Sequence, residues 1–512
     1  MPDADRSHFL ELAQSFDLVP VTRRVLSDSL TPVLAYRRLV SADHRTDTSF
    51  LLESVETGGR VGRHSILATS PQMELSARGD AVTLTDHRAD TVKRYDGVDP
   101  IQCIRDVMDG WRIAPSPQGE PRFCGGWAGW QGYDCVRRLE PDALPLSSAP
   151  PDDRNMPDLH LSLYGTAVVF DHVEKTIELT VWEDIDGDPN SAWNRGNARI
   201  DDLLKRLRSD SVPLGSGQVS IDTAAHVGLP GEPVMEREVF EDIVRRCIEY
   251  IRAGDVFQVV PSQRFDRTSQ ADPFDVYRAL RVVNPSPYMI YMQSPEVMLI
   301  ASSPEILCRV RGGEVVNRPL AGTRRRGTDA TQDAMLEAEL LGDEKERAEH
   351  SMLVDLARND LGTVCEPGSV SVDRLMEIER YSHVMHLSST VTGTLREGLD
   401  CWDALRYTLP VGTVSGAPKI RAMQIIDEME PVRRGPYAGG IGYVSFDGDM
   451  DMAIALRTIV SPVGDGCAPW MYHLQAGAGI VLDSNPESEY VETVNKAAAL
   501  GRALDLAEAM GS

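Results

Sequence analysis

The chain has 512 residues, enough for a large core and two or three domains, and a formal net charge of −26 from 52 basic and 78 acidic side chains. It has no long run of Lys or Arg, no apolar run long enough to span a bilayer and no CxxC pair among its 8 cysteines, which argues against nucleic-acid binding, membrane attachment and a disulfide or zinc framework. Because the N-terminus is acidic and polar, unlike a signal peptide, we expect a soluble cytoplasmic protein.

Hairpins are predicted in the first part of the chain. Residues 73–87 and 165–183 alternate apolar and polar side chains around short turns, which is typical of antiparallel strand pairs. Residues 208–233 are rich in Gly, Ser and Pro and form the best candidate for a linker. The linker divides the chain into an N-terminal α+β region, residues 1–215, and a second region, residues 235–505.

The second region mixes helices with strand pairs. It opens with an amphipathic helix over residues 236–255, which Gly254 is expected to end. Because strands joined by tight turns pair antiparallel, the pattern predicts an α+β protein. The further elements expected are strand pairs at 288–303 and 305–320, a long helix at about 331–361, a hairpin at 439–460 and a terminal helix from about Pro486, with Ser484 and Glu487 as a capping box.

Two of these helices carry acidic residues in an unusual position. At about 100° per residue, Glu346 and Glu349 fall on the apolar side of the long helix, and Glu489, Glu492 and Lys496 share one face of the terminal helix. If the helices met, each like-charge pair at about 6 Å would cost roughly 3 kcal/mol at an effective dielectric near 20, so a cation or protonation would be needed. Oxygen ligands without His or Cys favour Mg²⁺. Spacing alone also allows solvated faces with an ordinary Glu492–Lys496 ion pair.

Several later residues suit a bound anion. Pro418, in SGAPK, is expected in the first turn of a helix, whose free N–H groups can bind an anion. Gly477 and Gly479 permit close backbone approach to a ligand, although glycines at a strand end are often simple bulges. Arg457 is expected on a strand with apolar neighbours, where a buried guanidinium needs an anionic partner. His386 lies in a strand-like stretch and is either a satisfied core residue or a proton carrier.

Many short motifs follow one another in the second region. They are IRAGDVFQVVPSQRF (251–265), NPSPYM (284–289), SSPEIL (302–307), RPLAGTRRRG (318–327), SHVMHLSSTVTG (382–393), PVGTVSGAPKIRAM (410–423), GPYAGGIGYVSFDGDMDMAIALRT (435–458) and QAGAGIVLDSNPESEYVETVNKA (475–497). With the acidic helices, they make the chain similar to the chorismate-utilising enzymes, densely over about 235–505 and more weakly at LLES (51–54) and FCGGWAGWQGYD (123–134). The resemblance implies an α+β fold with a large antiparallel, β-sandwich-like core flanked by helices.

The resemblance also implies a magnesium site. Glu349 and Glu492 would be direct ligands of Mg²⁺, while Glu346 and Glu489 would act through water. The ion would hold a carboxylate of chorismate and withdraw charge from the ring as the leaving group departs. The acidic helices would then have a function inside an acidic protein.

The same resemblance implies a chorismate site. Tyr437 and Arg457 would hold the enolpyruvyl carboxylate, and Lys496 is a candidate partner for the second carboxylate. His386 would handle protons around the ring during loss of pyruvate. The full set implied as substrate-binding is Ala321, Gly322, Thr323, Tyr437, Arg457, Gly477, Ala478, Gly479 and Lys496, and the set implied as catalytic is His386, Thr413 and Gln258.

Two positions separate branches of this family. Isochorismate and salicylate synthases place a lysine where this chain has Gln258, and a lysine there can activate water whereas a glutamine cannot. Aminodeoxychorismate synthases commonly carry a lysine where Ala321 stands, and alanine has no nucleophile. The pair favours the branch that joins ammonia to chorismate and eliminates pyruvate to give anthranilate, the first step of tryptophan biosynthesis. Enzymes that form aminodeoxychorismate or aminodeoxyisochorismate are the alternative.

No source of ammonia is visible in the chain. The segment around Cys124 lacks the Gly-x-Cys-x-Gly elbow of glutamine amidotransferases. A separate glutamine amidotransferase subunit is therefore implied as a partner. In this family two copies of each subunit usually form a heterotetramer, which the sequence alone does not establish.

A tryptophan feedback site is implied by LLES and NPSPYM. The residues that would contact the amino acid are Glu53, Ser54, Pro287, Tyr288 and Met289. The first motif also suits a buried strand followed by a turn at Gly58-Gly59, and a strand edge can carry a ligand. Two other classes are disfavoured: all-helical prenyl-diphosphate enzymes need DDxxD runs, and a silent tryptophan-sensing binding protein would not need every metal and substrate position to be present.

Overall fold

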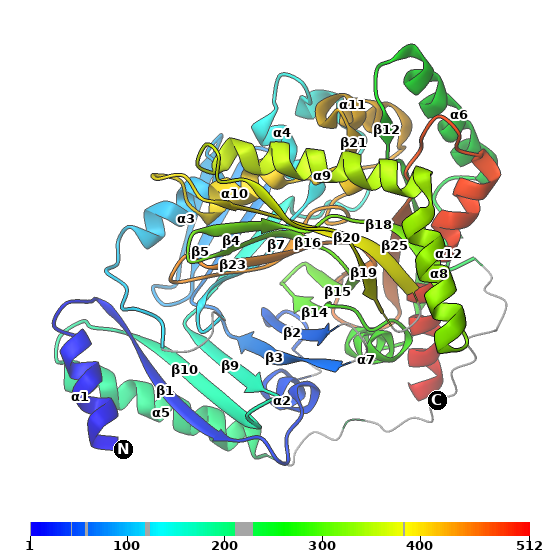
Figure 1. Cartoon of the computed structure of the whole chain (residues 1–512). Helices are drawn as coiled ribbons and strands as arrows, with labels where there is room; N and C mark the ends of the chain where they lie inside the picture. Colours follow the sequence, from blue (N-terminus) through cyan, green and yellow to red (C-terminus); the bar gives the residue numbers. More distant parts are fainter. Residues whose placement is uncertain are drawn as a thin grey trace.

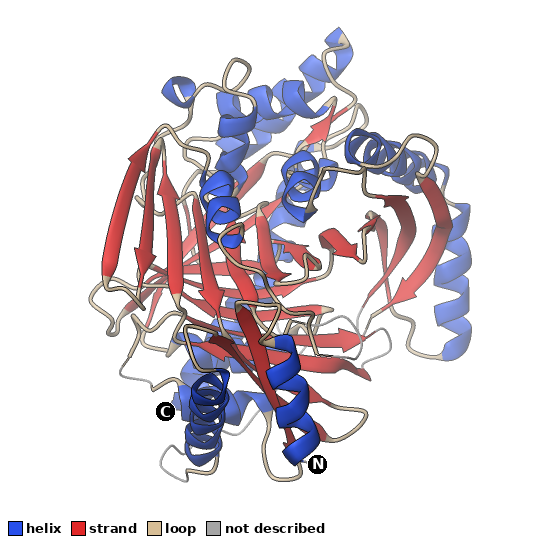
Figure 2. Cartoon of the chain, turned by 90° about the vertical axis from the view of Figure 1, so that its left-hand side faces the viewer, coloured by secondary structure: helices blue, strands red, loops and turns tan. Residues whose placement is uncertain are grey.

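Two large antiparallel sheets form the centre of the molecule, and helices lie on their outer faces (Figures 1 and 2). The computed structural model describes residues 2–41, 44–56, 60–117, 123–209, 214, 229–381 and 384–511. The predicted linker at 208–233 and the turn at Gly58-Gly59 lie largely or wholly outside these ranges. The α+β class and the large antiparallel core predicted from the sequence are confirmed.

The first sheet has 11 strands and combines both parts of the chain. Its strands, in spatial order, are β1 (Leu18–Leu26), β10 (Thr176–Asp184), β9 (Thr166–Asp171), β3 (Arg60–Thr69), β2 (Ser49–Glu56), β14 (Tyr288–Gln293), β15 (Val297–Ser303), β24 (Thr458–Pro462), β25 (Trp470–Gly477), β13 (Ser262–Ser269) and β11 (Glu232–Pro233). The two parts of the chain meet where β2 pairs with β14.

The second sheet has 12 strands and also combines both parts. Its order is β18 (Leu320–Arg325), β20 (Val384–Thr394), β17 (Glu314–Asn317), β16 (Ile306–Arg311), β23 (Met450–Ile454), β22 (Gly440–Ser445), β7 (Gly126–Gln131), β8 (Leu159–Tyr164), β4 (Met73–Arg78), β5 (Ala81–Asp86) and β6 (Thr91–Asp96), with β19 (Ser371–Arg380) on β20. A separate pair joins β12 (Gln258–Val259) to β21 (Gly416–Ala417). β7 pairs with β22, so each sheet contains strands from both sides of the boundary expected at 215–235. The division of the chain into a regulatory and a catalytic region stays a prediction.

The helices pack against the outer faces of the sheets. They are α1 (Pro2–Leu12), α2 (Pro32–Leu39), α3 (Pro100–Met108), α4 (Val136–Leu139), α5 (Pro189–Leu207), α6 (Arg237–Ala253), α7 (Pro273–Val283), α8 (Ala330–Gly342), α9 (Glu344–Val364), α10 (Cys401–Thr408), α11 (Lys419–Met429) and α12 (Pro486–Gly511), with 3-10 turns η1 (Tyr133–Cys135), η2 (Leu146–Ser148) and η3 (Gly412–Val414). In Figure 1, α9 lies above the second sheet, and α6 and α12 stand at the right. Within the described ranges, no helix combines the length and apolarity needed to cross a bilayer.

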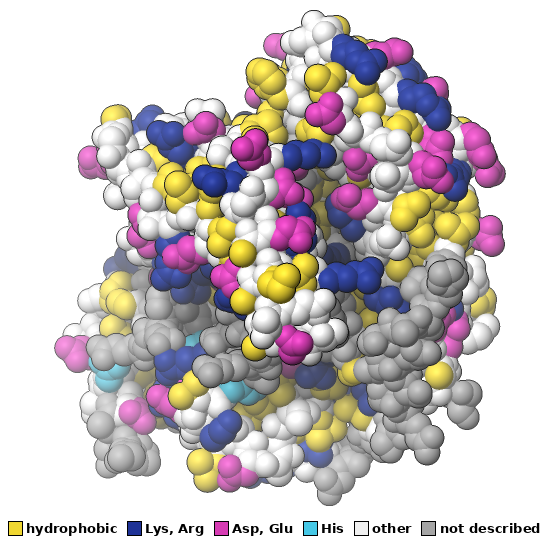
Figure 3. Space-filling view, turned by 45° about the vertical axis from the view of Figure 1, so that its right-hand side comes forward, with side chains coloured by type: hydrophobic (Ala, Val, Ile, Leu, Met, Phe, Trp, Pro, Cys, Tyr) yellow, Lys and Arg dark blue, Asp and Glu magenta, His cyan; other side chains and the backbone are white. Residues whose placement is uncertain are grey.

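Apolar side chains that alternate along the strands fill the space between the two sheets. Phe50 of β2, Trp130 of β7 and Ile290 of β14 belong to one buried cluster, because every second side chain of a strand points the same way. The other face of the first sheet, with Leu51 and Met289, packs with the helices. On the face drawn in Figure 3, acidic and basic side chains are interspersed, and neither sign covers a broad area.

Most of the predicted elements are present, including the hairpins β4–β5 and β9–β10. Helix α6 ends at Gly254, which adopts a φ of 85°. The single long helix expected at 331–361 is wrong: the chain forms α8 and α9, separated at Asp343. The carboxylate of Asp343 accepts hydrogen bonds from the N–H groups of Lys345 and Glu346, so a new helix starts there.

Three local expectations need correction. Pro418 is the N-terminal cap of α11, one residue before the first turn. Asn485, not Ser484, caps α12, because its Oδ1 accepts from the N–H of Ser488 at 3.1 Å. Arg457 lies between β23 and β24 with a φ of 47°, so it interrupts the strand on which it was expected.

Candidate active site

The residues predicted as metal ligands on α9 lie where the start of this helix meets β12 and the glycine segment after β25. Gln258 is 3% exposed, and its Nε2 donates to Oε1 of Glu349 at 2.8 Å. A side chain at Gly479 would bring its Cβ within 2.7 Å of Gln258 Nε2 and 3.6 Å of Glu349 Oε1. Glycine at 479 therefore permits this approach, as a ligand site requires.

The predicted carboxylates influence one another electrostatically. Burial raises the pKa of Glu349, and the nearby charges of Glu346 and Glu492 raise it further. Burial also raises the pKa of Glu489, opposed by a hydrogen bond from Ser484 and assisted by Glu492. The acidic residues of α9 and α12 therefore lie within electrostatic reach of one another, which spacing alone could not show.

The arrangement of the predicted metal ligands is open. In the described part of the chain, no three His, Cys, Asp or Glu side chains converge tightly enough to enclose a metal ion. Glu492 is 49% exposed and pairs with Lys496 at 2.7 Å, the ordinary ion pair that the spacing allowed. Two carboxylates with water and a substrate oxygen are a common environment for Mg²⁺, and this arrangement fits that pattern rather than a closed protein cage.

A second group of predicted residues surrounds the end of β25. Nζ of Lys496 donates to the carbonyl of Gly477 at 2.9 Å. The hydroxyl of Tyr437, which is 3% exposed, would lie 3.1 Å from a Cβ placed on Gly477. The N–H of Ala478 donates to Pro261 at 3.1 Å, which fixes the glycine segment beside β13.

His386 lies on β20 opposite Thr323 of β18. Its Nδ1 lies 2.9 Å from the carbonyl of Gly322 and 3.1 Å from Thr323 Oγ1. A carbonyl only accepts, so Nδ1 carries the proton and Nε2 keeps a lone pair. Burial, with the nearby charge of Arg457, lowers the pKa of His386 to about 4, so the ring is neutral at pH 7 and can accept a proton. A bulge at Gly322, with a φ of 61°, shapes this corner beside Ala321.

Arg457 has the character that an anion-binding residue needs. Burial lowers its pKa. Among the residues that the structure describes, none forms a hydrogen bond or ion pair with its guanidinium. A half-buried guanidinium without a partner is costly, and an incoming carboxylate would remove that cost. The sequence-based expectation of an anionic partner therefore stays a prediction with a clear physical reason.

Glu305, in the motif SSPEIL, is a functional candidate that the sequence interpretation missed. It is 6% exposed, and burial raises the pKa of its carboxyl to about 8. Its carboxyl approaches Thr413, a predicted catalytic residue, whose Oγ1 is otherwise buried without a partner. The two residues line a small cavity beside α9. The sequence signal for this residue was an acidic side chain between two apolar strands, β15 and β16.

The residues predicted to bind tryptophan lie on or beside the neighbouring strands β2 and β14, but their side chains point to both faces of the first sheet. Glu53 of β2 pairs with Met289 of β14 and accepts hydrogen bonds from Tyr277 at 2.6 Å and Arg281 at 3.2 Å on the helix side. The hydroxyl of Tyr288 donates to Asp451 of the second sheet at 2.8 Å.

Ser54 lies at an irregularity in the pairing of β2 with β3, between Glu53 and Val55. A Cβ on Gly62 would lie 2.6 Å from Ser54 Oγ, so β3 closes over this residue. Pro287 immediately precedes β14.

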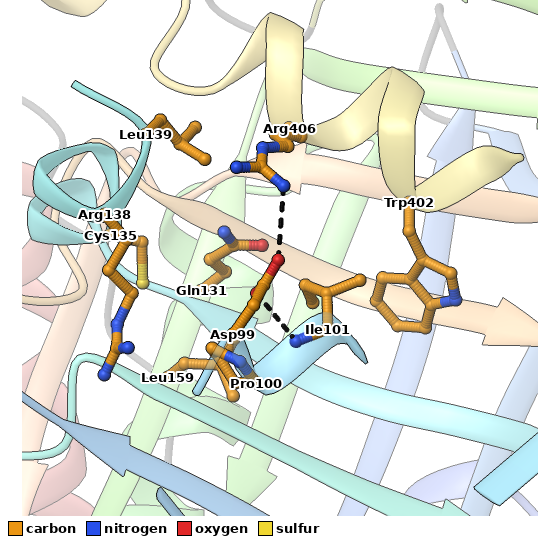
Figure 4. A pocket seen from close by; sticks show the side chains of 10 residues that line it. All are labelled: Asp99, Pro100, Ile101, Gln131, Cys135, Arg138, Leu139, Leu159, Trp402 and Arg406. Carbon is orange, nitrogen blue, oxygen red and sulfur yellow. Dashed lines mark hydrogen bonds and ion pairs between the residues drawn. The ribbon is translucent and has the colours of Figure 1, made fainter. Parts of the chain in front are cut away.

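A further small cavity lies at the N-terminus of α3 (Figure 4). Asp99 caps this helix through the N–H of Ile101 at 3.0 Å and accepts from Arg406 at 3.2 Å. Its lining is Asp99, Pro100, Ile101, Gln131, Cys135, Arg138, Leu139, Leu159, Trp402 and Arg406, which includes none of the predicted site residues.

Comparison with known proteins defines the class. The family model for chorismate-binding enzymes matches residues 47–502, so the chain belongs to that family. It is 52% identical to anthranilate synthase alpha subunit 1, chloroplastic, of Oryza sativa subsp. indica, over 97% of this chain and 89% of the relative. It is 44% identical to anthranilate synthase component 1 of Pseudomonas aeruginosa, over 98% of this chain and 99% of the relative.

A solved structure shows the same relationship. The crystal structure of anthranilate synthase component I from Streptococcus pneumoniae TIGR4 superimposes with a TM-score of 0.71 at 36% identity, covering 94% of this chain and 99% of that chain. Within the chorismate-binding enzymes, the chain therefore groups with the component I, or alpha, subunits of anthranilate synthase. The family and the enzyme class predicted from the motifs are confirmed.

Proposed function

We propose that this chain converts chorismate and ammonia into anthranilate and pyruvate with Mg²⁺ as its cofactor. The observation that carries the proposal is the hydrogen bond from Gln258 to Glu349. An amide that donates to a metal-site carboxylate cannot act as a base for water, and Ala321 offers no nucleophile. Neutral ammonia needs neither, because its own lone pair attacks.

The charged side chains around the glycine segment can bind the two carboxylates of the substrate. Arg457 and Tyr437 would take the enolpyruvyl carboxylate, because a guanidinium and a phenol can both donate to it. Lys496 would face the ring carboxylate from α12. Glu349 and Glu492 would hold Mg²⁺, with Glu346 and Glu489 acting through water. When bound, the ion supplies positive charge that neutralises a substrate carboxylate and stabilises charge developing in the ring.

Proton transfer can be assigned to two buried residues. Glu305 holds its proton at pH 7 because its pKa is about 8, so it can give that proton to the 4-hydroxyl as it leaves as water. Ammonia forms the new bond at C2. The neutral Nε2 of His386 can then remove the C2 proton while the bond from C3 to the enolpyruvyl oxygen breaks. The enolate that leaves takes up a proton at its methylene carbon and becomes pyruvate, the ammonium group at C2 loses a proton to solvent, and the ring becomes aromatic.

We further propose that ammonia comes from a glutamine amidotransferase subunit and that tryptophan inhibits the enzyme. The eight cysteines are all free, and Cys467 alone among them is exposed, so the chain offers no accessible catalytic thiol in a glutaminase-like setting. Free thiols suit the reducing cytoplasm predicted from the sequence. The rice relative is chloroplastic by its name, so fractionation of the source cells would decide the compartment.

One assay tests the proposal. The purified chain, with chorismate, Mg²⁺ and ammonium at alkaline pH, should form a fluorescent product that chromatography identifies as anthranilate. Glutamine in place of ammonium should give none, and a chelator should stop the reaction. Product from glutamine without a partner would contradict the two-subunit arrangement. Accumulation of an aminodeoxychorismate or aminodeoxyisochorismate would favour the alternative enzymes, and tryptophan binding without turnover would favour a sensor.

A further inference from the structure

A buried arginine outside the predicted site lies at the junction of several of its segments. Arg434, which follows α11, is 2% exposed. Its guanidinium donates to both oxygens of Glu430, from Nε to Oε2 at 2.9 Å and from Nη2 to Oε1 at 2.5 Å. Burial acts to lower the pKa of Arg434, but the charge of Glu430 outweighs this effect and raises it, so the arginine stays charged.

The remaining N–H groups of this guanidinium reach two segments that carry predicted catalytic residues. Nη1 donates to the carbonyl of Val414 at 2.7 Å, and Val414 follows Thr413 directly. Nη2 donates to the carbonyl of Val260 at 2.6 Å, two residues after Gln258. Both carbonyls lie just outside the β12–β21 pair, one residue after β12 and two residues before β21, and the arginine supplies a donor to each.

The same guanidinium lies beside two aromatic rings. Its central carbon is 5.8 Å from the ring centre of Tyr437 and 4.6 Å from that of Tyr133. A cation near an aromatic ring is attracted to its face. Tyr437 carries the hydroxyl that approaches Gly477, so the position of the arginine fixes the ring on which a predicted substrate contact depends.

Glu430 extends the network to the glycine segment. Its Oε1 accepts from the N–H of Ser262 at 2.7 Å and from Ser262 Oγ at 2.9 Å. The preceding residue, Pro261, accepts from the N–H of Ala478. One buried ion pair thus connects the four stretches of chain that surround the proposed substrate.

We propose that Arg434 is a positioning residue for the reaction, holding the segments of Gln258, Thr413 and Tyr437 at fixed separations from one another. The inference rests on the proposed function. A planar guanidinium presents five N–H donors in a fixed plane, and here they serve a carboxylate and two carbonyls at once. A lysine has a single ammonium nitrogen and cannot span these acceptors. A shift of about 1 Å between reacting groups can cost about 100-fold in rate, so a small loosening here would be measurable.

The first test compares R434K with the matched control R264K. Arg264 is 4% exposed and binds Asp153 at 3.0 Å and Asp266 at 2.9 Å, but it contacts none of the predicted site residues. In the ammonium assay, we expect R434K to lower kcat by tenfold or more and to raise the KM for chorismate. We expect R264K to keep both close to wild type, although its melting temperature falls by a similar amount. Equal kinetics for the two variants would overturn the inference.

A double variant separates positioning from stability. R434M leaves the charge of Glu430 buried and unpaired, whereas R434M/E430Q removes both charges and keeps an acceptor for Ser262. We expect the double variant to recover much of the melting temperature that R434M loses, but not kcat, because the carbonyls of Val260 and Val414 still lack their donor. Recovery of kcat together with stability would show a purely structural role.

The proposed function can fail independently of this inference. If the wild-type chain forms no anthranilate, the proposed function is wrong whatever the variants do. Chorismate binding, followed by calorimetry with Mg²⁺ but without ammonia, still compares R434K with R264K in that case. Weaker binding by R434K alone would support positioning, and equal binding by the two variants would contradict it.

Discussion

The active site and the predicted tryptophan strands both contain buried polar groups, but their polar groups differ in how far they are paired. Near the chorismate site, Arg457 has no partner in the described chain, and Oε1 of Gln258 is buried without one. In the strands, Glu53 accepts from Tyr277 and Arg281, and Tyr288 is bonded to Asp451. The first arrangement has unsatisfied groups that a ligand can satisfy directly.

This difference bears on how each site would work. An unpaired guanidinium gains free energy when a carboxylate arrives, so substrate binding there needs little rearrangement. A ligand that competes for paired groups must replace existing bonds, so its binding favours a changed conformation of the strands. β2 and β14 belong to the sheet that includes β24, which follows Arg457 directly. Regulation through the shared sheet is therefore physically reasonable, and the coupling must be reciprocal.

The largest expected effect concerns the metal site. Glu349→Gln or Glu492→Gln should lower kcat by about 1,000-fold or more, because a metal ligand contributes several kcal/mol to charge stabilisation. The variants should melt no lower than wild type, since repulsion between carboxylates is relieved. Anthranilate fluorescence and thermal unfolding measure the two quantities. Glu344→Gln, on the exposed side of α9, is the control and should be near wild type. Near-normal activity of either variant at low Mg²⁺ would disprove the ligand assignment.

The second prediction compares two arginines directly. Arg457→Met should raise the KM for chorismate by about 30-fold or more, because a charged contact with the substrate is lost. Its stability should be unchanged or higher, because no protein partner is lost. Arg281→Met removes a partner of Glu53 and should lower stability by about 1–3 kcal/mol, with KM near wild type. Steady-state kinetics and denaturant unfolding decide both. If Arg457→Met were the less stable of the two, its role would be structural.

The third prediction concerns the strands. Ser54→Phe should fill the space between β2 and β3 and weaken tryptophan binding. With a coupling typical of allosteric enzymes, tryptophan would change chorismate affinity by about 5- to 150-fold in the wild type, and this change should largely disappear in the variant. A single titration of activity against tryptophan measures both basal rate and inhibition. Full sensitivity would remove Ser54 from the regulatory site, and loss of basal activity in a folded variant would assign it to the active site.

The smallest expected effect is a pH dependence. Glu305 must be protonated to act as an acid, and its pKa is about 8, so the rate at constant free ammonia should fall about tenfold by pH 9. The folded pKa lies above the ordinary value of 4.5, so the stability that the neutral carboxyl provides is full at low pH and is lost as pH rises towards 8. Glu305→Gln should remove this slope in unfolding experiments. A slope that persists would point to another group.

Several parts of the fold could be predicted from the sequence because they depend on neighbouring residues. Alternation identified the hairpins, and glycine marked the end of α6. The break between α8 and α9 was missed, since Asp343 in a run of good helix formers is a weak local signal until its carboxylate is seen to cap Lys345 and Glu346. The joining of both chain regions in each sheet was missed as well, because strand pairing over long sequence separations leaves no local pattern.

The features of the candidate site can also be divided into those that the sequence predicts and those that depend on long-range contacts. The sequence determined the chemistry: acidic pairs at helical spacing, glycines where a ligand approaches, a glutamine where a base would otherwise stand, and motifs that resemble one enzyme family. Only the tertiary structure decided that Glu349 meets Gln258, that Glu305 keeps its proton, and that Arg434 holds the surrounding segments. The physical reason is that residue type and spacing fix what a group can do, whereas burial and long-range contacts set its charge state and its partners.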